Sequence, residues 1–173
     1  MEADAFMDFD KIFEIMDETF PDCEMRSYDG QKKLLDNSKY NIYVKRNDEG
    51  SIVGFLAYWD LDSCLFFEHL VVSPRYRGHG LGSQIILENI KNVNKPVFLE
   101  VELPRDESSQ RRINFYKRFG FVLNDFYYEQ PALRLNSEKL QLMIMSYPNS
   151  IDEAGFVDYK KEIYDNVYNQ PIN

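Results

Sequence analysis

The sequence has few cysteines and few histidines. Its 173 residues include only two of each. Cys23 and Cys64 lie far apart and form neither a CxxC pair nor a disulfide framework, which favours a reduced protein of the cytoplasm. The placement of His69 and His79 does not suggest a zinc site, so we expect no bound metal.

Positive charge is also scarce, because 20 Lys and Arg residues stand against 29 Asp and Glu residues, giving a formal net charge of −9. Nucleic acid is therefore not expected as the main partner, since phosphate contacts need clustered Lys and Arg. An acidic surface is compatible with a cationic amine substrate, and it is also common among soluble proteins.

No apolar run approaches membrane-spanning length. The first ten residues carry four acidic side chains where a secretory signal would be basic and then apolar. We therefore expect no contact with a membrane.

With 44% apolar residues, the chain is long enough to form one sizeable core. Hydrophobic spacing and turn residues predict helices over 6–20, 31–37, 81–92, 108–119 and 151–168, and strands over 40–45, 51–60, 64–72, 96–103, 121–128 and 139–147. This order predicts a single domain over 1–173 of the α/β (α+β) class, with a mixed, mostly antiparallel sheet flanked by helices. The C-terminal helix is amphipathic and is a candidate element of a homodimer.

The most informative segment is Arg75-Tyr76-Arg77-Gly78-His79-Gly80-Leu81-Gly82, between an apolar strand and a helix. Glycines at alternate positions let backbone N–H groups converge, as in a site for a phosphate. A Walker loop would place Lys after the last glycine, where this chain has Ser83. A dinucleotide fingerprint would follow the first strand of a βαβ unit, whereas this turn follows an antiparallel meander.

The stretch from Val72 to Gly82 resembles the acetyl-CoA signature of the GNAT N-acetyltransferase superfamily, an Arg or Gln followed by xxGxG or xxGxA. Both Arg75 to Gly80 and Arg77 to Gly82 satisfy the pattern, and the second register better matches the spacing from the preceding valine. Phe115-Tyr116-Lys117-Arg118-Phe119-Gly120-Phe121 is similar to a later family motif, and Leu99-Glu100-Val101 to the strand before it. The resemblance is strongest over 40–147.

The resemblance implies a GNAT-like fold with acetyl-CoA (CoA) as cofactor. It places the pyrophosphate on the glycine turn and the pantetheine arm along the preceding strand. The cofactor-binding residues it implies are Leu70, Val71, Val72, Arg77, Gly78, His79, Gly80, Leu81, Gly82 and Ser83. Ser109 stands where many relatives have Asn, so a side-chain contact to the cofactor from that helix is in doubt.

Three residues are candidates for the chemistry. Glu68 matches a base of some relatives, and its apolar neighbours predict a pKa raised by desolvation; the alternative is an edge carboxylate paired with a cation. Glu100 is the competing base, and Tyr116 is the candidate acid that protonates the leaving thiolate, unless it is a core aromatic. His69 should face away from Glu68, because neighbouring strand residues alternate.

The function predicted is acetyl transfer from acetyl-CoA to a primary amine of a small molecule or a protein, directly within a ternary complex. The alternative is a non-catalytic acyl-CoA-binding regulatory or interaction module of the same fold. A basic cluster after residue 104 either holds the 3′-phosphate of CoA or is the solvated face of a helix; its members are Arg105, Arg111, Arg112, Lys117 and Arg118.

Overall fold

A six-stranded sheet forms the centre of the computed structural model, which describes residues 7–169, and its strands lie in the order β1-β2-β3-β4-β6-β5. The strands are β1 (Tyr40–Arg46), β2 (Ile52–Asp60), β3 (Leu65–Val72), β4 (Val97–Glu102), β5 (Val122–Gln130) and β6 (Leu140–Tyr147). The helices are α2 (Phe9–Asp17), α3 (Tyr28–Lys33), α4 (Leu81–Ile90), α5 (Glu107–Lys117) and α6 (Glu153–Ile163). Only β3 and β4 pair in parallel, which confirms the mixed, mostly antiparallel sheet.

Helix α3 begins earlier than the sequence predicts. The side chain of Ser27 accepts a hydrogen bond from the backbone N–H of Gly30 and caps the helix ahead of Tyr28. The helix then tightens into a 3₁₀ turn over Leu34–Asp36. The first predicted helix included Phe6, which lies outside the described residues, and α2 ends at Asp17.

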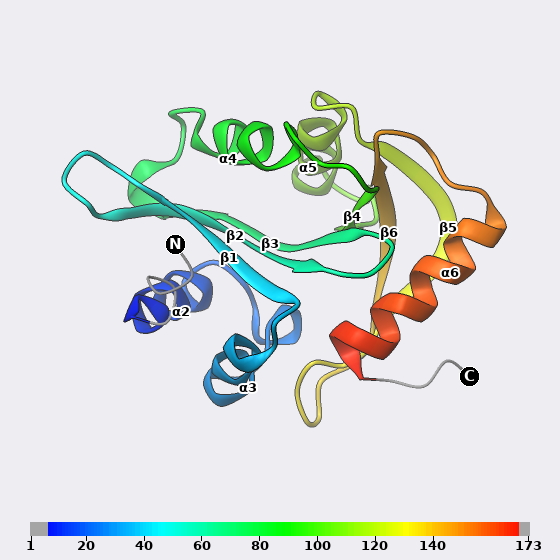
Figure 1. Ribbon diagram of the computed structural model, residues 1–173, viewed down its shortest axis with the longest axis horizontal. Coiled ribbons are helices and arrows are strands. Elements are labelled where there is room, and N and C mark those ends of the chain that lie inside the picture. The colour runs from blue at the N-terminus through cyan, green and yellow to red at the C-terminus, as the bar shows by residue number, and fades with distance from the viewer. Residues whose placement is uncertain (1–6, 170–173) are drawn as a thin grey trace.

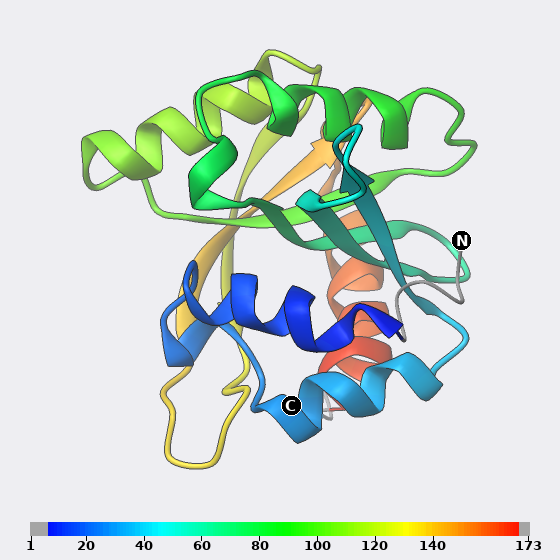
Figure 2. The same ribbon diagram turned by 90° about the vertical axis from the view of Figure 1, so that its left-hand side faces the viewer.

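Helices cover both faces of the sheet (Figures 1 and 2). On one face, α4 and α5 bury Ile85 and Ile113 against β4 in one apolar cluster. On the opposite face, α2 buries Ile12 and Met16 against Phe55 of β2. Burial of this apolar surface is the main force that holds the helices on the sheet.

The predicted C-terminal helix forms and lies against the β5–β6 end of the sheet (Figure 1). It continues as a π-helical segment over Tyr164–Tyr168, and the two together bury Tyr159, Ile163 and Val167 in the core. This apolar face is therefore used within the chain, and the homodimer stays a prediction. None of the helices described over 7–169 is long and apolar enough to cross a membrane.

A β-bulge interrupts β3 where it pairs with β2. His69 lies opposite Ala57 and Phe67 opposite Tyr58, so Glu68 is the extra residue between them. A bulge reverses the alternation of side chains along a strand. Glu68 and His69 consequently both lie on the face that carries α2 and α6, and the prediction that they face opposite sides is wrong.

The sheet splits beside this bulge. The parallel pairing of β3 with β4 covers only Leu65–Phe67 against Val97–Leu99. Glu68 on β3 and Glu100 on β4 are the first residues beyond the paired segment on each strand. The split therefore leaves the β4-facing edge of the later part of β3 without a strand partner and places two carboxylates beside the opening.

Candidate active site

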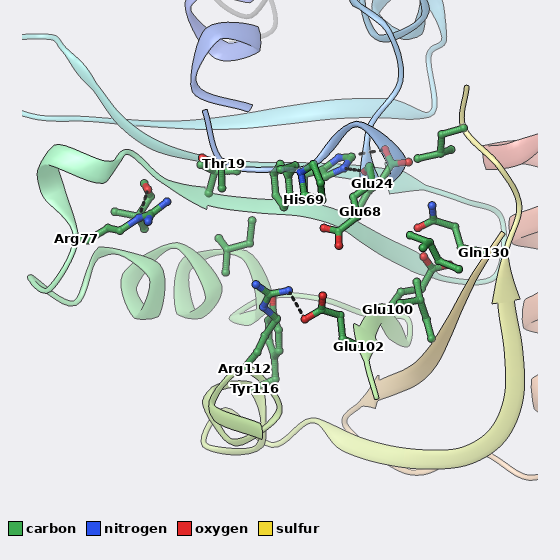
Figure 3. A pocket seen from close by; sticks show the side chains of 18 residues that line it. Thr19, Glu24, Glu68, His69, Arg77, Glu100, Glu102, Arg112, Tyr116 and Gln130 are labelled. Carbon is green, nitrogen blue, oxygen red and sulfur yellow. Dashed lines mark hydrogen bonds and ion pairs between the residues drawn. The ribbon is translucent and has the colours of Figure 1, made fainter. Parts of the chain in front are cut away.

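A cavity of about 470 Å³ occupies the split between β3 and β4. Figure 3 shows its side chains, which come from both faces of the sheet: Tyr116 and Arg112 from α5, Glu68 and His69 from β3, and Glu100 and Glu102 from β4. The other lining residues are Thr19, Phe20, Pro21, Glu24, Leu70, Val71, Val72, Arg77, Gln130, Leu133, Leu140 and Leu142. Two molecules entering from opposite faces of the sheet can meet inside such an opening.

The glycine turn fits an anion. Gly78 and Gly80 have φ angles of +83° and +73°, which favour glycine, and a Cβ added at either would have no neighbour within 4 Å. Gly80 is the N-cap of α4 and supplies no side chain to cap its first N–H groups. Those N–H groups and the positive end of the helix dipole provide the cradle that a diphosphate needs.

The turn is fastened to the end of β3 next to the cavity. The Nε of Arg77 donates to the carbonyl oxygen of Val72 at 3.2 Å, and Nδ1 of His79 lies 2.9 Å from the carbonyl oxygen of Arg77. The predicted strand residues Leu70, Val71 and Val72 line the cavity directly before the turn. The anion cradle and the unpaired edge of β3 thus form one continuous surface.

Glu68 is paired with a cation that the sequence did not identify. Its Oε1 accepts from Nη1 of Arg26 at 2.7 Å, and its Oε2 accepts from Nε1 of Trp59 at 3.1 Å. The side chains of Glu68 and Arg26 are 5% and 10% exposed. Burial alone would raise the pKa of Glu68, but the charge of Arg26 and the hydrogen bonds hold it below its usual value. The predicted rise of this pKa is wrong for that reason.

His69 lies beside Glu68 and is held neutral. Its Nε2 lies 3.0 Å from the backbone carbonyl oxygen of Glu24, which can only accept a hydrogen bond, so Nε2 carries the proton. Burial lowers the pKa of His69, and the nearby charge of Glu68 only partly offsets this. Its Nδ1 has no hydrogen-bond partner among residues 7–169.

Glu100 forms no ion pair with any residue in the range 7–169. Its carboxylate accepts hydrogen bonds from two phenols, those of Tyr128 and Tyr168. Burial raises the pKa of Glu100 to about 7, the two phenols oppose the rise, and the charge of Glu68 adds to it. Of the two predicted bases, Glu100 is the one whose proton exchanges near neutral pH.

Tyr116 lies on the α5 side of the same cavity (Figure 3). Its ring packs edge-on against Phe115 and Phe121. No residue in the described part of the chain forms a hydrogen bond with its hydroxyl. Burial raises the pKa of Tyr116 to about 12, so the phenol carries its proton at neutral pH.

The start of α5 is capped in a way that explains the unusual Ser109. The side chain of Asp106 accepts from the backbone N–H of Ser109 at 2.8 Å, and the hydroxyl of Ser109 reaches back to the N–H of Asp106. Ser109 is buried in this capping box. Its side chain therefore fixes the helix that carries Tyr116.

Carboxylates and an unpartnered amide surround the part of the cavity away from the glycine turn. Glu24 and Glu102 lie at one side, where Arg112 forms an ion pair with Glu102 at 3.4 Å. Gln130 at the end of β5 is 7% exposed and points into the cavity (Figure 3). Its Nε2 has no hydrogen-bond partner within residues 7–169. A buried amide without a partner is costly unless a ligand satisfies it.

Sequence reasoning missed several of these residues. Arg26 and Gln130 sit in segments without a recognisable motif. Arg26 reaches Glu68 across 42 residues of sequence, and the fold brings Gln130 to the cavity. Tyr128 belongs to the aromatic run Phe126-Tyr127-Tyr128, and the sequence does not reveal that Tyr128 is buried while Tyr127 is exposed. Tyr168 gave no signal apart from its place in an amphipathic helix.

Comparison with known proteins gives a consistent picture. The sequence model of the Acetyltransferase (GNAT) family matches residues 9–121. YjbC of Bacillus subtilis, provisionally named an acetyltransferase, is 34% identical over 161 residues, which is 90% of this chain and 80% of that protein.

Solved structures share the fold. A GNAT-family protein of Bacteroides thetaiotaomicron, also provisionally named an acetyltransferase, superposes with a TM-score of 0.89 at 27% identity, covering 99% of this chain and 97% of that one. Spermidine N-acetyltransferase of Vibrio cholerae, in complex with CoA and spermine, has a TM-score of 0.54 at 14% identity, covering 70% and 75% of the two chains. This second similarity concerns the fold alone.

Proposed function

Because the chain belongs to the GNAT acetyltransferase family, we propose that it is an acetyl-CoA-dependent N-acetyltransferase whose acceptor is a primary amine of a small molecule or a protein. Membership confirms the resemblance found in the sequence, and the mixed sheet with its flanking helices confirms the predicted fold class. The observation that carries the proposal is the cavity through the split sheet. It joins an anion-binding turn to a carboxylate with a pKa near 7.

The donor side of the site is the glycine turn and the edge of β3. When bound, acetyl-CoA supplies an activated thioester carbonyl and a thiolate leaving group. The N–H groups from Arg77 to Ser83 would hold the pyrophosphate, since Gly78 and Gly80 carry no side chain that would fill the open space beside them. Leu70–Val72 pair with β2 on one side, and their β4-facing edge, which has no strand partner, would orient the pantetheine arm as it would pair with another strand.

Glu100 is the general base in this proposal. A primary amine is largely protonated at neutral pH and must lose a proton before it can attack a carbonyl. With its pKa raised to about 7, Glu100 exchanges its proton near neutral pH and accepts the proton of the amine directly or through water. Glu68 is held ionised in a buried ion pair with Arg26, so it is not the base in this proposal.

Tyr116 is the general acid. Its phenol lies in the cavity, keeps its proton at neutral pH and has no partner in the described chain that would hold that proton. A thiolate leaving from the donor side needs a proton, and Tyr116 is the phenol available there. Base and acid therefore act from different elements, Glu100 from β4 and Tyr116 from α5.

The acceptor side favours a cationic amine. Glu24 and Glu100 line it without an ion-pair partner in the described part of the chain, and their charge would disfavour a free carboxylate on the acceptor. Glu68 and Glu102 also line it, but each is paired with an arginine. Gln130 supplies a hydrogen bond to a polar group of the acceptor, because its own amide has no protein partner. The carbon chain of the amine would pack against an apolar wall of the cavity, formed by Leu133, Leu140 and Leu142.

Release of the CoA thiol from acetyl-CoA across a panel of amines tests this function. We expect kcat/KM to rise with pH through about 7, because the base works in its ionised form. Glu100→Gln should lose about a hundredfold or more in turnover and lose this pH dependence. Glu138→Gln, the same change on an exposed loop, should behave as the unaltered protein.

The predicted alternative, a non-catalytic acyl-CoA-binding module, gives a different result. Acetyl-CoA would then bind, as measured by calorimetry, while no amine in the panel promoted thiol release. Equal turnover in Glu100→Gln and the unaltered protein would contradict the role of Glu100 and leave Glu68 as the base.

A further inference from the structure

The end of the C-terminal helix reaches the carboxylate of Glu100. The hydroxyl of Tyr168, in the π-helical segment after α6, lies 2.8 Å from Oε2 and 3.0 Å from Oε1 of Glu100. The hydroxyl of Tyr128 on β5 donates to Oε1. Both rings are buried. One carboxylate on β4 is thus fixed by two phenols from elements that follow it in the chain.

These two tyrosines lie beyond residues 9–121, the part of the chain that matches the family model. Their phenols act as donors at all ordinary pH, because burial and the charge of Glu100 raise their pKa values well above the usual value. A carboxylate accepts both bonds only through its oxygens, so the two donors fix the plane of the carboxyl group.

Tyr168 is itself held in place next to Glu68. Nη2 of Arg26 donates to the carbonyl oxygen of Val167 at 2.9 Å, while Nη1 of the same guanidinium binds Glu68. The residue before Tyr168 is therefore tied to the ion pair at the β3 side of the split. The segment cannot move away from Glu100 without breaking a buried hydrogen bond.

We propose that Tyr128 and Tyr168 are positioning residues that orient the Glu100 carboxylate toward the acceptor and hold it in its ionised form. The segment that follows α6 then completes the active site rather than only covering the sheet. This inference rests on the proposed function in so far as Glu100 is the base. The hydrogen-bond geometry and its effect on Glu100 can be measured without any substrate.

Groups from several elements determine whether the Glu100 carboxyl group is protonated or ionised. Burial and the charge of Glu68 on β3 favour the protonated form, whereas Tyr128, Tyr168 and Arg26 favour the ionised form. The charge of Glu100 also raises the pKa values of Tyr159 and Tyr164 on the α6 side, although neither phenol forms a hydrogen bond with it. Removing one phenol takes away one stabilising bond to the anion and must raise the pKa of Glu100.

The test follows the titration of the Glu100 carboxyl group in the Tyr168→Phe variant by NMR of 13C-labelled glutamate side chains. The protein contains no acetyl-CoA, and Glu100→Gln serves to assign the signal. Loss of one hydrogen bond to a charged group shifts the midpoint of Glu100 upward by about one pH unit. The acid limb of the kcat/KM profile should move by the same amount, so activity falls about fivefold at pH 7 and recovers at higher pH.

Tyr164→Phe is the matched control, because its hydroxyl donates to the carbonyl oxygen of Glu129 and ties the same segment to β5 without contacting Glu100. It should leave the Glu100 midpoint in place. Tyr128→Phe provides a second variant with the same expected upward shift, in case Tyr168→Phe does not fold.

An unshifted Glu100 midpoint in the folded Tyr168→Phe and Tyr128→Phe variants would overturn the proposal. So would a loss of activity that is equal at every pH, which a purely structural tie would produce. If the unaltered protein transferred no acetyl group while the Glu100 midpoint still shifted, the proposed function would fail and the tyrosine pair would stand.

Discussion

Two glutamates begin the diverging parts of neighbouring strands, and their partners give them different chemistry. Glu68 contacts the guanidinium of Arg26, which keeps its pKa low in spite of burial. Within residues 7–169, the carboxylate of Glu100 accepts hydrogen bonds from neutral phenols and forms no ion pair, so burial prevails and its pKa rises to about 7. The same residue type thus has a pKa lowered by an ion pair at one position and a pKa raised by burial at the other.

Tyr116 can be tested by removing one oxygen atom. Tyr116→Phe keeps the ring that packs against Phe115 and Phe121 but removes the proton donor. We expect kcat to fall about 10²- to 10⁴-fold while acetyl-CoA affinity, measured by calorimetry, stays unchanged. Unaltered turnover would remove Tyr116 from the mechanism, and a parallel loss of affinity would show a packing role instead.

The sequence predicted which residues meet at the site better than it predicted their protonation states. Glu68, Glu100 and Tyr116 do line one cavity. The choice between the two bases depended on Arg26 and Tyr168, which approach from 42 and 68 residues away in the sequence. Desolvation and pairing act in opposite directions on a buried carboxylate, and only the tertiary contacts decide which is larger.

At the scale of the element, two glycine substitutions can distinguish the structural role of the glycine turn from its proposed role in binding. Gly80 at the start of α4 and Gly50 in the β1–β2 turn have φ angles of +73° and +82°, and neither has a neighbour within 4 Å of an added Cβ. A valine at either position carries a similar backbone cost, on the order of 1–2 kcal/mol or more. Only the Cβ at position 80 would project beside the anion cradle.

Gly80→Val should therefore abolish measurable acetyl-CoA binding in calorimetry, whereas Gly50→Val should bind normally. Urea unfolding of both variants should show a similar loss of stability, which identifies the difference in binding as local. Normal binding by a folded Gly80→Val protein would contradict the cradle and would favour a turn without a ligand.

The elements themselves follow from local sequence in most places, because apolar spacing and turn residues act over short distances. The six strands and α4 to α6 form close to where they are predicted. The bulge at Glu68 was not predictable from β3 alone, since it arises in the pairing with β2. The early start of α3 at Tyr28 depends on a single serine cap that the periodicity of the helix does not reveal.

At the scale of the whole molecule, the charge balance distinguishes the two substrates of the proposed reaction. The chain carries a formal net charge of −9, and the acceptor side of the cavity adds to the negative field at the amine. The negative charge of the protein attracts a cationic amine and, over the same range, repels the polyanionic CoA. In the proposed reaction, the backbone groups at the start of α4 would therefore hold the CoA pyrophosphate mainly by short-range contacts.

Salt should consequently change the two Michaelis constants in opposite directions. The range of electrostatic attraction falls from about 30 Å at 0.01 M salt to about 8 Å at 0.15 M. Over this interval we expect KM to rise about two- to fivefold for a cationic amine and to fall for acetyl-CoA, as measured by steady-state kinetics at constant pH. The KM of an amine with one positive charge should change less with salt than the KM of an amine with two. If both constants rose together, a basic surface would be guiding acetyl-CoA to the site, and the exposed arginines of α5 would be the first residues to replace.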